Sequence, residues 1–370
     1  MIDTMGIILA DDTKIPPITD IRVPAALPIA GRYRVIDFIL SNMVNSGITN
    51  IGVVTEANYS SLMDHLRLGK PWDLDRKNQG LRIIPPNMAN LRGGMRGDMD
   101  MLLEIRDFLS RSHQTYVLLA RGNTINNIDF HDAMHFHIDS QADVTMLYRD
   151  MAGAAEEELS RFNLFEVQAD GRITDIEVRP YYPKSAFAGM DICIMEKALL
   201  ESIIDEGAAK GIHDFVKDIL IRKLEGLRIY GYCFDGYSDK IDSMKAYYRN
   251  CMGFLQAQVR EELFCPERPI YTKTKDQPPT KYGGSAVLEN AFISDGCTIE
   301  GEVRDSVLSR GVRVEKGAVV RNSIIMQDSV IESGAILDHV VFDKEVHITK
   351  GRRLIGQANY PLAIAKRTKI

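Results

Sequence analysis

A six-residue repeat in the last third of the chain limits the folds open to this sequence more than any other feature. Its apolar register, large except for one alanine, comprises Val312, Ala318, Ile324, Val330, Ile336, Phe342 and Ile348. The residue before each is mostly small, as in Gly311, Gly317 and Ser323. Six residues turn an α-helix well past one and a half revolutions, so a helix cannot hold this register on one face. A parallel β-helix can, because each flat side is a short strand with an inward apolar residue and a small corner residue.

The repeat is disturbed ahead of residue 312. Ile293 and Ile299 have the same spacing in a different phase, which predicts an irregular coil near residues 300–308. Ordinary β-hairpins with accidental phasing are the alternative interpretation, and the length of the unbroken register favours the β-helix.

The first two thirds of the chain alternate short apolar runs with segments of helical spacing. Residues 5–10, 51–55, 116–120 and 143–148 each have the pattern of a buried strand, and residues 99–112 that of a helix. Such alternation predicts a mainly parallel sheet with helices on both faces. Ligands bind such sheets at the carboxyl ends of the strands, so the loops after Ala10 and Ala120 are the expected site of chemistry.

The 370 residues are more than one small core requires and favour two domains. The boundary follows from the polar, proline-containing stretch at residues 272–284. We expect an α/β domain over residues 1–250, a linker over 251–284 and a β-helix domain over 285–370.

The net charge limits the binding partners expected for this chain, and the cysteines indicate its cellular compartment. A formal net charge of −6 gives no broad surface for nucleic acid or an anionic membrane. No apolar run is long enough to span a bilayer, and the first residues lack the basic region of a signal peptide. Five scattered cysteines without CxxC spacing favour idle thiols in a reducing cytoplasm.

Three motifs carry a family resemblance that runs from residue 5 nearly to the C-terminus. Residues 26–42 read ALPIAGRYRVIDFILSN and continue to NSGI at 45–48, while 213–218 read HDFVKD and 278–282 read PPTKY. The sequence resembles the glucose-1-phosphate adenylyltransferases (ADP-glucose pyrophosphorylases). The resemblance implies a nucleotide-diphospho-sugar transferase domain (Rossmann-like, GT-A-type) followed by a left-handed parallel β-helix. It also implies a reaction in which glucose-1-phosphate attacks the α-phosphate of ATP and releases pyrophosphate.

The phosphate-binding loop of that family is glycine-rich, and here it is not. Residues 10–19 read ADDTKIPPIT, without a glycine. Glycines let backbone N–H groups approach a polyphosphate closely. Asp11 and Asp12 instead place negative charge where triphosphate would bind, and Lys14 at the family's arginine position keeps one positive point charge. The loop therefore has the character of a solvated acidic turn.

The two magnesium-binding aspartates of the family are also replaced. Asn123 falls at the first and offers an oxygen without a charge. Tyr237 falls at the second, although a shift of one or two residues would bring Asp235 or Asp239 there. The resemblance thus implies no metal site on this chain.

The sugar-phosphate site keeps some of its residues. Val178 replaces a glutamate for the sugar hydroxyls, Gly189 replaces a serine, and an acidic Asp191 intrudes. Arg179 replaces a lysine and is able to grip a phosphate bidentately. Asp214 matches a sugar-contacting aspartate, with a helix N-cap as the equally favoured interpretation.

The phosphate loop, the magnesium positions and the sugar site have all changed, while the motif at 26–48 is intact. This pattern resembles the D-type regulatory subunit of some bacterial glycogen systems. We expect a non-catalytic subunit, with Lys14, Arg179 and Asp214 as vestigial substrate contacts and degenerate catalytic positions at Lys14, Asn123 and Tyr237. Its expected partner is a catalytic glucose-1-phosphate adenylyltransferase that carries the magnesium, in a mixed tetramer; a homo-oligomer is the other assembly.

Three alternatives stay open at this point. The chain is a weakly active adenylyltransferase using Lys14, Arg179 and Asp235 or Asp239, an effector-binding subunit that never contacts nucleotide, or a β-helix acyltransferase. The last would need a histidine between coils, for which His339 and His347 are the C-terminal candidates.

Overall fold

A nine-stranded mixed sheet forms the centre of the N-terminal domain in the computed structural model, which describes residues 3–87 and 97–370. Its parallel half has the order β6 (Tyr116–Arg121), β1 (Thr4–Ala10), β4 (Asn50–Thr55) and β5 (Gly80–Ile84). With β8 (Val144–Asp150), these strands confirm all four strand predictions.

The other half of the sheet is built around β11 (Phe187–Glu196), which runs antiparallel to β6, to β8 and to β9 (Asn163–Val167). The hairpin partner of β9 is β10 (Ile173–Val178), and β12 (Ile229–Cys233) lies parallel to β8. The expectation of a mainly parallel sheet therefore holds for one half only, because β11 enters the centre of the sheet in the opposite direction.

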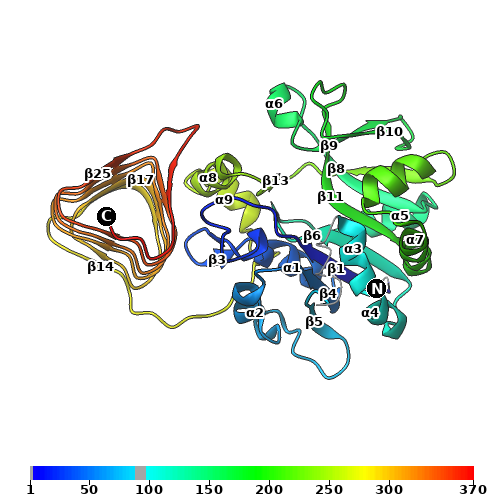
Figure 1. Cartoon of the computed structure of the whole chain (residues 1–370), viewed down its shortest axis with the longest axis horizontal. Coiled ribbons are helices and arrows are strands. Elements are labelled where there is room, and N and C mark those ends of the chain that lie inside the picture. Colours follow the sequence, from blue (N-terminus) through cyan, green and yellow to red (C-terminus); the bar gives the residue numbers. More distant parts are fainter. Residues whose placement is uncertain (1–2, 88–96) are drawn as a thin grey trace.

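Helices cover both faces of this sheet (Figure 1). One apolar cluster includes residues of α1 (Ile36–Asn45), α2 (Ser60–Leu66) and α5 (Phe130–Asp139). The opposite cluster includes residues of α3 (Asp98–Glu104), α4 (Arg106–Arg111) and α7 (Lys197–Lys210). The helix predicted over 99–112 is thus two short helices that meet at Ile105.

Short elements complete the domain. They are the 3-10 turns Pro24–Ala26, Lys70–Trp72 and Ile221–Lys223, the π-turn Val216–Leu220, helix α6 (Glu156–Leu159), and strands β2 (Pro28–Ile29), β3 (Tyr33–Arg34), β7 (Thr124–Asn126) and β13 (Ser238–Lys240).

The segment expected as a linker begins inside a helix. Helix α8 (Met244–Gly253) is followed by α9 (Ala257–Leu263), after which the chain has no helix or strand until β14 (Lys281–Tyr282). The domain boundary itself stays a prediction.

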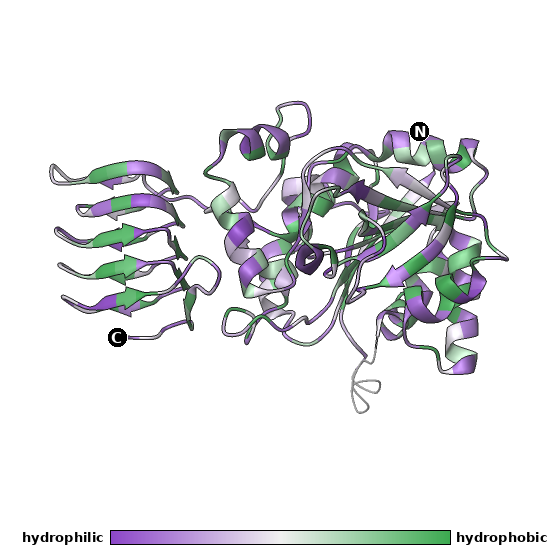
Figure 2. Ribbon diagram, turned by 90° about the horizontal axis from the view of Figure 1, so that it is seen from above, coloured by the Kyte–Doolittle hydropathy of each residue, from purple (hydrophilic) through white to green (hydrophobic). Residues whose placement is uncertain are grey.

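The C-terminal domain is a parallel β-helix, triangular in cross-section and layered in side view (Figures 1 and 2). After β14 its strands are β15 (Val287–Ile293), β16 (Thr298–Ile299), β17 (Glu302–Leu308), β18 (Arg313–Val314), β19 (Val319–Arg321), β20 (Ile324–Ile325), β21 (Val330–Ile331), β22 (Ile336–Asp338), β23 (Val340–Phe342), β24 (His347–Ile348), β25 (Arg353–Ile355) and β26 (Leu362–Ile364). All their pairings are parallel.

The β-helix prediction is confirmed, but the single six-residue register is not. Val303 pairs with Val320, Val320 with Leu337 and Leu337 with Leu354, so these coils are 17 residues apart. A 17-residue coil is one short of three sixes, so the inward positions drift out of the six-residue register. Ile331 and Leu337 are consequently buried in the core, while Val330 and Ile336 beside them are partly exposed.

The predicted irregular coil is also confirmed. Val287 pairs with Glu302 and Thr298 with Arg313, which makes this coil two residues shorter than those that follow. The shortening removes residues at the corners while the parallel pairing continues.

The two domains share a buried interface. Residues of α8 and α9 join Ile324, Met326 and Val341 of the β-helix in one apolar cluster. Arg22, which follows the loop after β1, pairs with Asp343 at 2.8 Å, and both side chains are almost fully buried. This ion pair ties the loop beside the expected site to the second domain.

All five cysteines are free thiols, as their scattered spacing predicts. In the part of the chain that the structure describes, no helix has the length and apolar character needed to cross a bilayer.

Replacing Asp343 with alanine would leave the buried Arg22 guanidinium without its carboxylate. Breaking such a pair costs about 3 kcal/mol, so the free energy of unfolding, measured by urea titration, is expected to fall by that amount. Arg321→Ala, which removes the exposed pair with Glu302, serves as the control and should cost less than about 1 kcal/mol. The double variant Arg22→Leu/Asp343→Leu should lose less than Asp343→Ala, since no charge stays unpaired; an equal or larger loss would contradict this reasoning.

Candidate functional site

A cavity of about 430 Å³ opens at the carboxyl ends of β1 and β6, where the loops after Ala10 and Ala120 were expected to meet. Among the described residues, its charged lining consists of Asp11, Asp12, Glu56, Asp98, Asp191, Asp214, Arg121 and Arg179. Carboxylates therefore outnumber basic groups, and an incoming polyanion meets net negative charge.

A second cavity of about 310 Å³ adjoins the first and shares Asp11, Arg121, Arg179 and Asp191 with it. Thr13 also lines both cavities, and the second is further lined by Asn123, Arg161, Lys240, Asp242 and Ser243. Because the two cavities have four charged residues in common, we treat them as one site with an acidic and a mixed-charge compartment.

Arg121 is the central cation of this site. Its guanidinium donates to both oxygens of Asp98 at 2.5 and 2.6 Å and to Asp11 at 2.9 Å. Although burial opposes the charge, these carboxylates raise the pKa of Arg121 above its usual value. The positive charge beside the phosphate loop is therefore already neutralised by carboxylates of the chain itself.

The loop after β1 is held by its own polar groups. Asp11 also accepts from the Thr13 hydroxyl at 2.9 Å, and Asp12 pairs with Lys14. Lys14 is 60% exposed and lines neither cavity, so the structure does not bring it to the other candidate residues. The loop closes at Thr19, whose buried hydroxyl accepts from the backbone N–H of Ile15 at 2.6 Å.

Asn123 lies in the second compartment, at the first of the two magnesium positions. Its amide donates to the backbone carbonyl of Ile241 at 3.1 Å, and its buried Oδ1 accepts no hydrogen bond from the described residues. Nearby, the buried Lys240 ammonium lies 3.4 Å from Asp191. Lys240 and Arg121 together lower the pKa of the Asp191 carboxyl, although burial opposes this shift.

The residue at the second magnesium position and its two alternatives do not line the two cavities. The Tyr237 hydroxyl donates to Asn250 of α8 at 2.8 Å, and neither Tyr237 nor Asp235 lines the two cavities. Asp239 is buried, pairs with Arg249 and accepts from Asn250 at 2.7 Å. Asp235 and Asp239, the two carboxylates considered for the second magnesium position, therefore line neither cavity.

On the sugar side of the site, one cation has no ion-pair partner among the described residues. Arg179 follows β10, lines both cavities and makes no ion pair or hydrogen bond with the described residues. Asp214 lines the first cavity and accepts from the backbone N–H of Lys217 at 2.8 Å, so it both faces the cavity and caps a helical turn. At Gly189 a Cβ atom would lie 2.6 Å from the Phe165 ring, so the family's serine would fit only after Phe165 moved.

These residues do not fit a magnesium ion at the family's position. The oxygen at that position is the neutral Oδ1 of Asn123. The carboxylates of the same compartment, Asp11, Asp191 and Asp242, are paired with Arg121, Lys240 and Arg161. Magnesium prefers carboxylate and water oxygens, and a fixed positive charge opposes its binding. In residues 3–87 and 97–370, no three His, Cys, Asp or Glu side chains are grouped to hold a metal ion.

Sequence reasoning missed Arg121, Asp98 and Lys240. One signal was available for Arg121, since it directly follows a predicted strand and so lies at the sheet edge where Asp11 follows the neighbouring strand. Asp98 and Lys240 carried no such signal, because only the fold brings α3 and β13 to this edge.

The comparisons with known proteins agree with this architecture. A family model described as nucleotidyl transferase matches residues 5–255, and one described as the GlmU-like C-terminal hexapeptide matches residues 278–359. Fold and site therefore define a nucleotidyl transferase domain joined to a hexapeptide β-helix.

Individual relatives narrow this class. The chain is 34% identical to the glycogen biosynthesis protein GlgD of Bacillus subtilis (strain 168), over 93% of this chain and 90% of the relative. It is 30% identical to the glucose-1-phosphate adenylyltransferase of Bacillus mycoides (strain KBAB4), over 94% and 93%, and 34% identical to that of Desulfitobacterium hafniense (strain Y51), over 83% and 77%. The chain belongs to the glucose-1-phosphate adenylyltransferase (ADP-glucose pyrophosphorylase) family. Both names occur at similar identity, so the role within the family has to be argued from the site.

Glu56 provides a pH-dependent test of the acidic compartment. Burial and the charges of Asp11 and Asp12 raise the pKa of Glu56 from 4.5 to about 7. The folded state thus favours protonated Glu56, a stabilisation that is full below pH 4.5 and is lost as the pH rises through 7. Glu56→Gln mimics the protonated form and should stabilise the protein by about 1 kcal/mol at pH 8, allowing for screening by water, and by little at pH 5.

Urea unfolding of wild type and Glu56→Gln at the two pH values measures this difference. Glu225→Gln at an exposed turn is the control and should show no change between pH 5 and pH 8. An equal effect of Glu56→Gln at both pH values would contradict the raised pKa of Glu56.

Proposed function

We propose that this chain is a non-catalytic subunit that regulates glucose-1-phosphate adenylyltransferase in glycogen synthesis. The observation that carries the proposal is the position of Arg121, paired with Asp98 and Asp11 at the cavity edge that faces the phosphate loop. A triphosphate would need a cation at this position, and here the cation, Arg121, is already paired with two carboxylates of the chain.

Electrostatics supports the loss of catalysis. Phosphoryl transfer depends on positioning and on neutralising the charge of the phosphates. Losing one preorganised electrostatic contact typically costs ~10²–10³ in rate. Here the glycine loop is replaced by Asp11 and Asp12, and the first magnesium aspartate by Asn123. These losses fall on one reacting centre, so their effects combine.

Magnesium belongs, in this proposal, to a catalytic partner. Asn123 donates to Ile241 and lines the same compartment as Lys240, so this position suits an internal polar contact better than a divalent cation. We accordingly assign this chain no metal of its own.

The intact motif at residues 26–48 is explained by the fold. It builds α1, whose Ile36, Phe38 and Ile39 are fully buried. Its Asp37, also fully buried, lies 2.5 Å from His65. The retained motif therefore reflects a maintained core, as expected for a subunit selected to keep its shape without its chemistry.

A relative with 34% identity over nearly its whole length is named a glycogen biosynthesis protein, whereas others are named as the adenylyltransferase. We propose a mixed tetramer in which this chain, as the regulatory subunit, associates with a catalytic glucose-1-phosphate adenylyltransferase. The vestigial contacts Arg179 and Asp214 would then serve effector or sugar-phosphate binding, and Lys14 would keep the loop closed.

Co-expression with a catalytic glucose-1-phosphate adenylyltransferase tests this function. The isolated chain should form no ADP-glucose from ATP, glucose-1-phosphate and magnesium. The two chains should elute together in size-exclusion chromatography, and the complex should differ from the catalytic chain alone in maximal rate or in response to metabolites. An equal mass of albumin in place of this chain is the control.

Two outcomes would contradict the proposal. One is turnover by a preparation of this chain that contains no catalytic homologue. The other is separate elution of the two chains with unchanged kinetics of the catalytic one.

A further inference from the structure

Negative charge is in excess in the acidic compartment, the first of the two cavities of the site. Burial, together with the charges of Asp11 and Asp12, raises the pKa of Glu56 to about 7. Burial also raises the pKa of the Asp98 carboxyl, and the charges of Asp11 and Asp214 add to this shift. Carboxyl groups that raise the pKa of one another mark a place where a positive charge is stabilised. The compartment therefore attracts a cation.

Several acceptor oxygens of the residues that line the site have no donor. The side chain of Asp12 is only 10% exposed, and its Oδ1 accepts no hydrogen bond from the described residues. The same holds for Oδ1 of Asn163, which begins β9 and lines the acidic compartment. It also holds for Oδ1 of Asn123 in the adjoining compartment, a residue that is 5% exposed. Buried acceptors without a donor are unfavourable, so a ligand that brings N–H donors would be stabilised here.

The rest of the wall of the acidic compartment is apolar. It includes Leu102, Leu119, Met146 and Phe165, which all belong to a buried apolar cluster of the domain. Alkyl groups gain free energy when they leave water for such a wall, whereas a hydrated metal ion does not. Within the described part of the chain, the carboxylates are also not grouped to hold a metal ion. Charge, acceptors and wall together suit an organic cation.

We propose that the acidic compartment binds a linear alkyl diamine, with its ammonium groups against Asp12, Glu56 and Asp214 and its methylene groups against the apolar wall. A protonated diamine supplies two positive charges and several N–H donors, which are what this compartment lacks. The cavity of about 430 Å³ is within the usual range for a small-molecule site. The loop that is glycine-rich and binds polyphosphate elsewhere in the family would thus help to bind a ligand of opposite charge.

This inference rests on the proposed function and deepens it, because it names the class of effector that the altered cavity would take. Its test uses the isolated chain without a catalytic partner. A failure to bind the diamine would leave the association with a catalytic chain untouched. Turnover by the isolated chain, which would contradict the proposed function, is detected by a separate assay.

Isothermal titration of the full-length chain with putrescine tests the site. Both amines of putrescine, like that of lysine, are protonated between pH 6 and pH 8. Wild type should show saturable binding with a dissociation constant below about 1 mM at pH 8. Glucose titrated under the same conditions should give no saturable heat.

The pH dependence of this binding reports on Glu56. The charged groups that face it are Asp11 and Asp12 after β1, Asp98 of α3 and Arg121 of β6. The diamine favours ionised Glu56, and the ionised fraction increases as the pH rises through about 7. The affinity of wild type should therefore rise roughly 5-fold from pH 6 to pH 8. Glu56→Gln should bind with the same affinity at both pH values.

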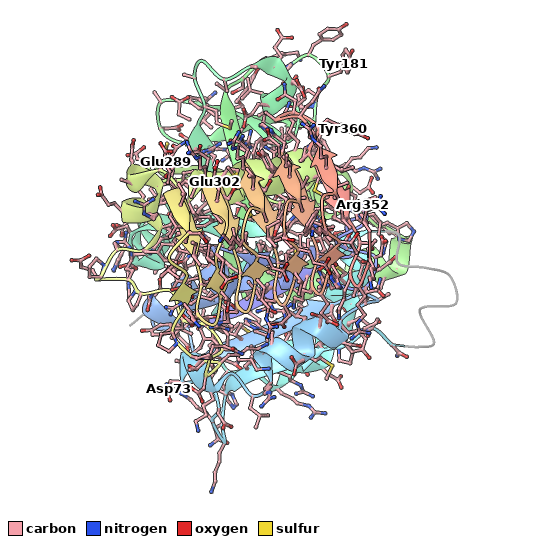
Figure 3. All side chains as sticks on the ribbon, turned by 90° about the vertical axis from the view of Figure 1, so that its left-hand side faces the viewer. Asp73, Tyr181, Glu289, Glu302, Arg352 and Tyr360 are labelled. Carbon is pink, nitrogen blue, oxygen red and sulfur yellow. The ribbon has the colours of Figure 1, made fainter. Side chains whose placement is uncertain are left out.

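A matched pair of charge variants separates the cavity from the general surface. Asp214→Asn removes a charge of the cavity while an asparagine can still accept from the backbone N–H of Lys217, so it should raise the dissociation constant roughly 3- to 10-fold. Asp73→Asn is the control. Figure 3 shows Asp73 at the outer edge of the domain, where its side chain is 87% exposed and lines neither cavity. This variant should bind as wild type does.

Four results would overturn the proposal. They are the absence of saturable putrescine binding, an affinity of wild type that does not change between pH 6 and pH 8, and an equal effect of Asp214→Asn and Asp73→Asn, which would indicate binding to the general surface. The fourth is saturable binding of glucose in place of putrescine, which would assign the acceptor oxygens to sugar hydroxyls.

Discussion

The ion pairs of Arg121 with Asp98 and Asp11 determine what this fold can do. They join the ends of β6 and β1 to the start of α3, so three segments of the site are fixed by one guanidinium. In an active enzyme of this chemistry, positive charge at such an edge has to be free to meet phosphate. Here the positive charge of Arg121 is neutralised by carboxylates of the same chain. The other carboxylates leave the acidic compartment with excess negative charge. In the proposed function, the same contacts that order the loop also lower its affinity for a polyanion.

The site is joined to the β-helix domain by buried contacts. The loop that starts at Asp11 leads to Arg22, whose buried pair with Asp343 fastens it to the β-helix. Helix α8 packs on the same domain, and its Tyr248 hydroxyl donates to the carbonyl of Asn322 at 2.7 Å. A change in how the β-helix is held in an assembly would thus be felt at the loop. In the proposed regulatory subunit, this connection would be a physical route by which assembly and site influence each other.

Much of the fold was predictable because its signals are local. The six-residue spacing of apolar residues from Val312 to Ile348 indicates a β-helix, although Val330 and Ile336 are only partly buried, and the four apolar runs indicate strands. The 17-residue length of the coils was not predictable from this spacing. One residue fewer at a corner shifts the inward positions by one, while the six-residue spacing on either side of that corner stays the same. Likewise, the acidic character of Asp11 was evident, but its partner Arg121 lies 110 residues away, and Arg22 and Asp343 are 321 residues apart. The pairing of Arg22 with Asp343 depends on topology and carries no signal in the sequence, whereas the place of Arg121 directly after a predicted strand was a signal for its position at the sheet edge. The destinations of Tyr237 and Asp239, both held by α8 side chains, were hidden for the same reason.

The central claim is that Arg121, the cation beside the phosphate loop, is already paired with carboxylates of the chain, so that the site does not bind a magnesium–triphosphate complex. Isothermal titration of the isolated chain with MgATP tests it most directly, with a catalytic glucose-1-phosphate adenylyltransferase titrated under the same conditions to show that binding is detectable. The account predicts no saturable heat for this chain up to millimolar nucleotide, an affinity weaker than about −4 kcal/mol. Stoichiometric binding with a micromolar dissociation constant would contradict it.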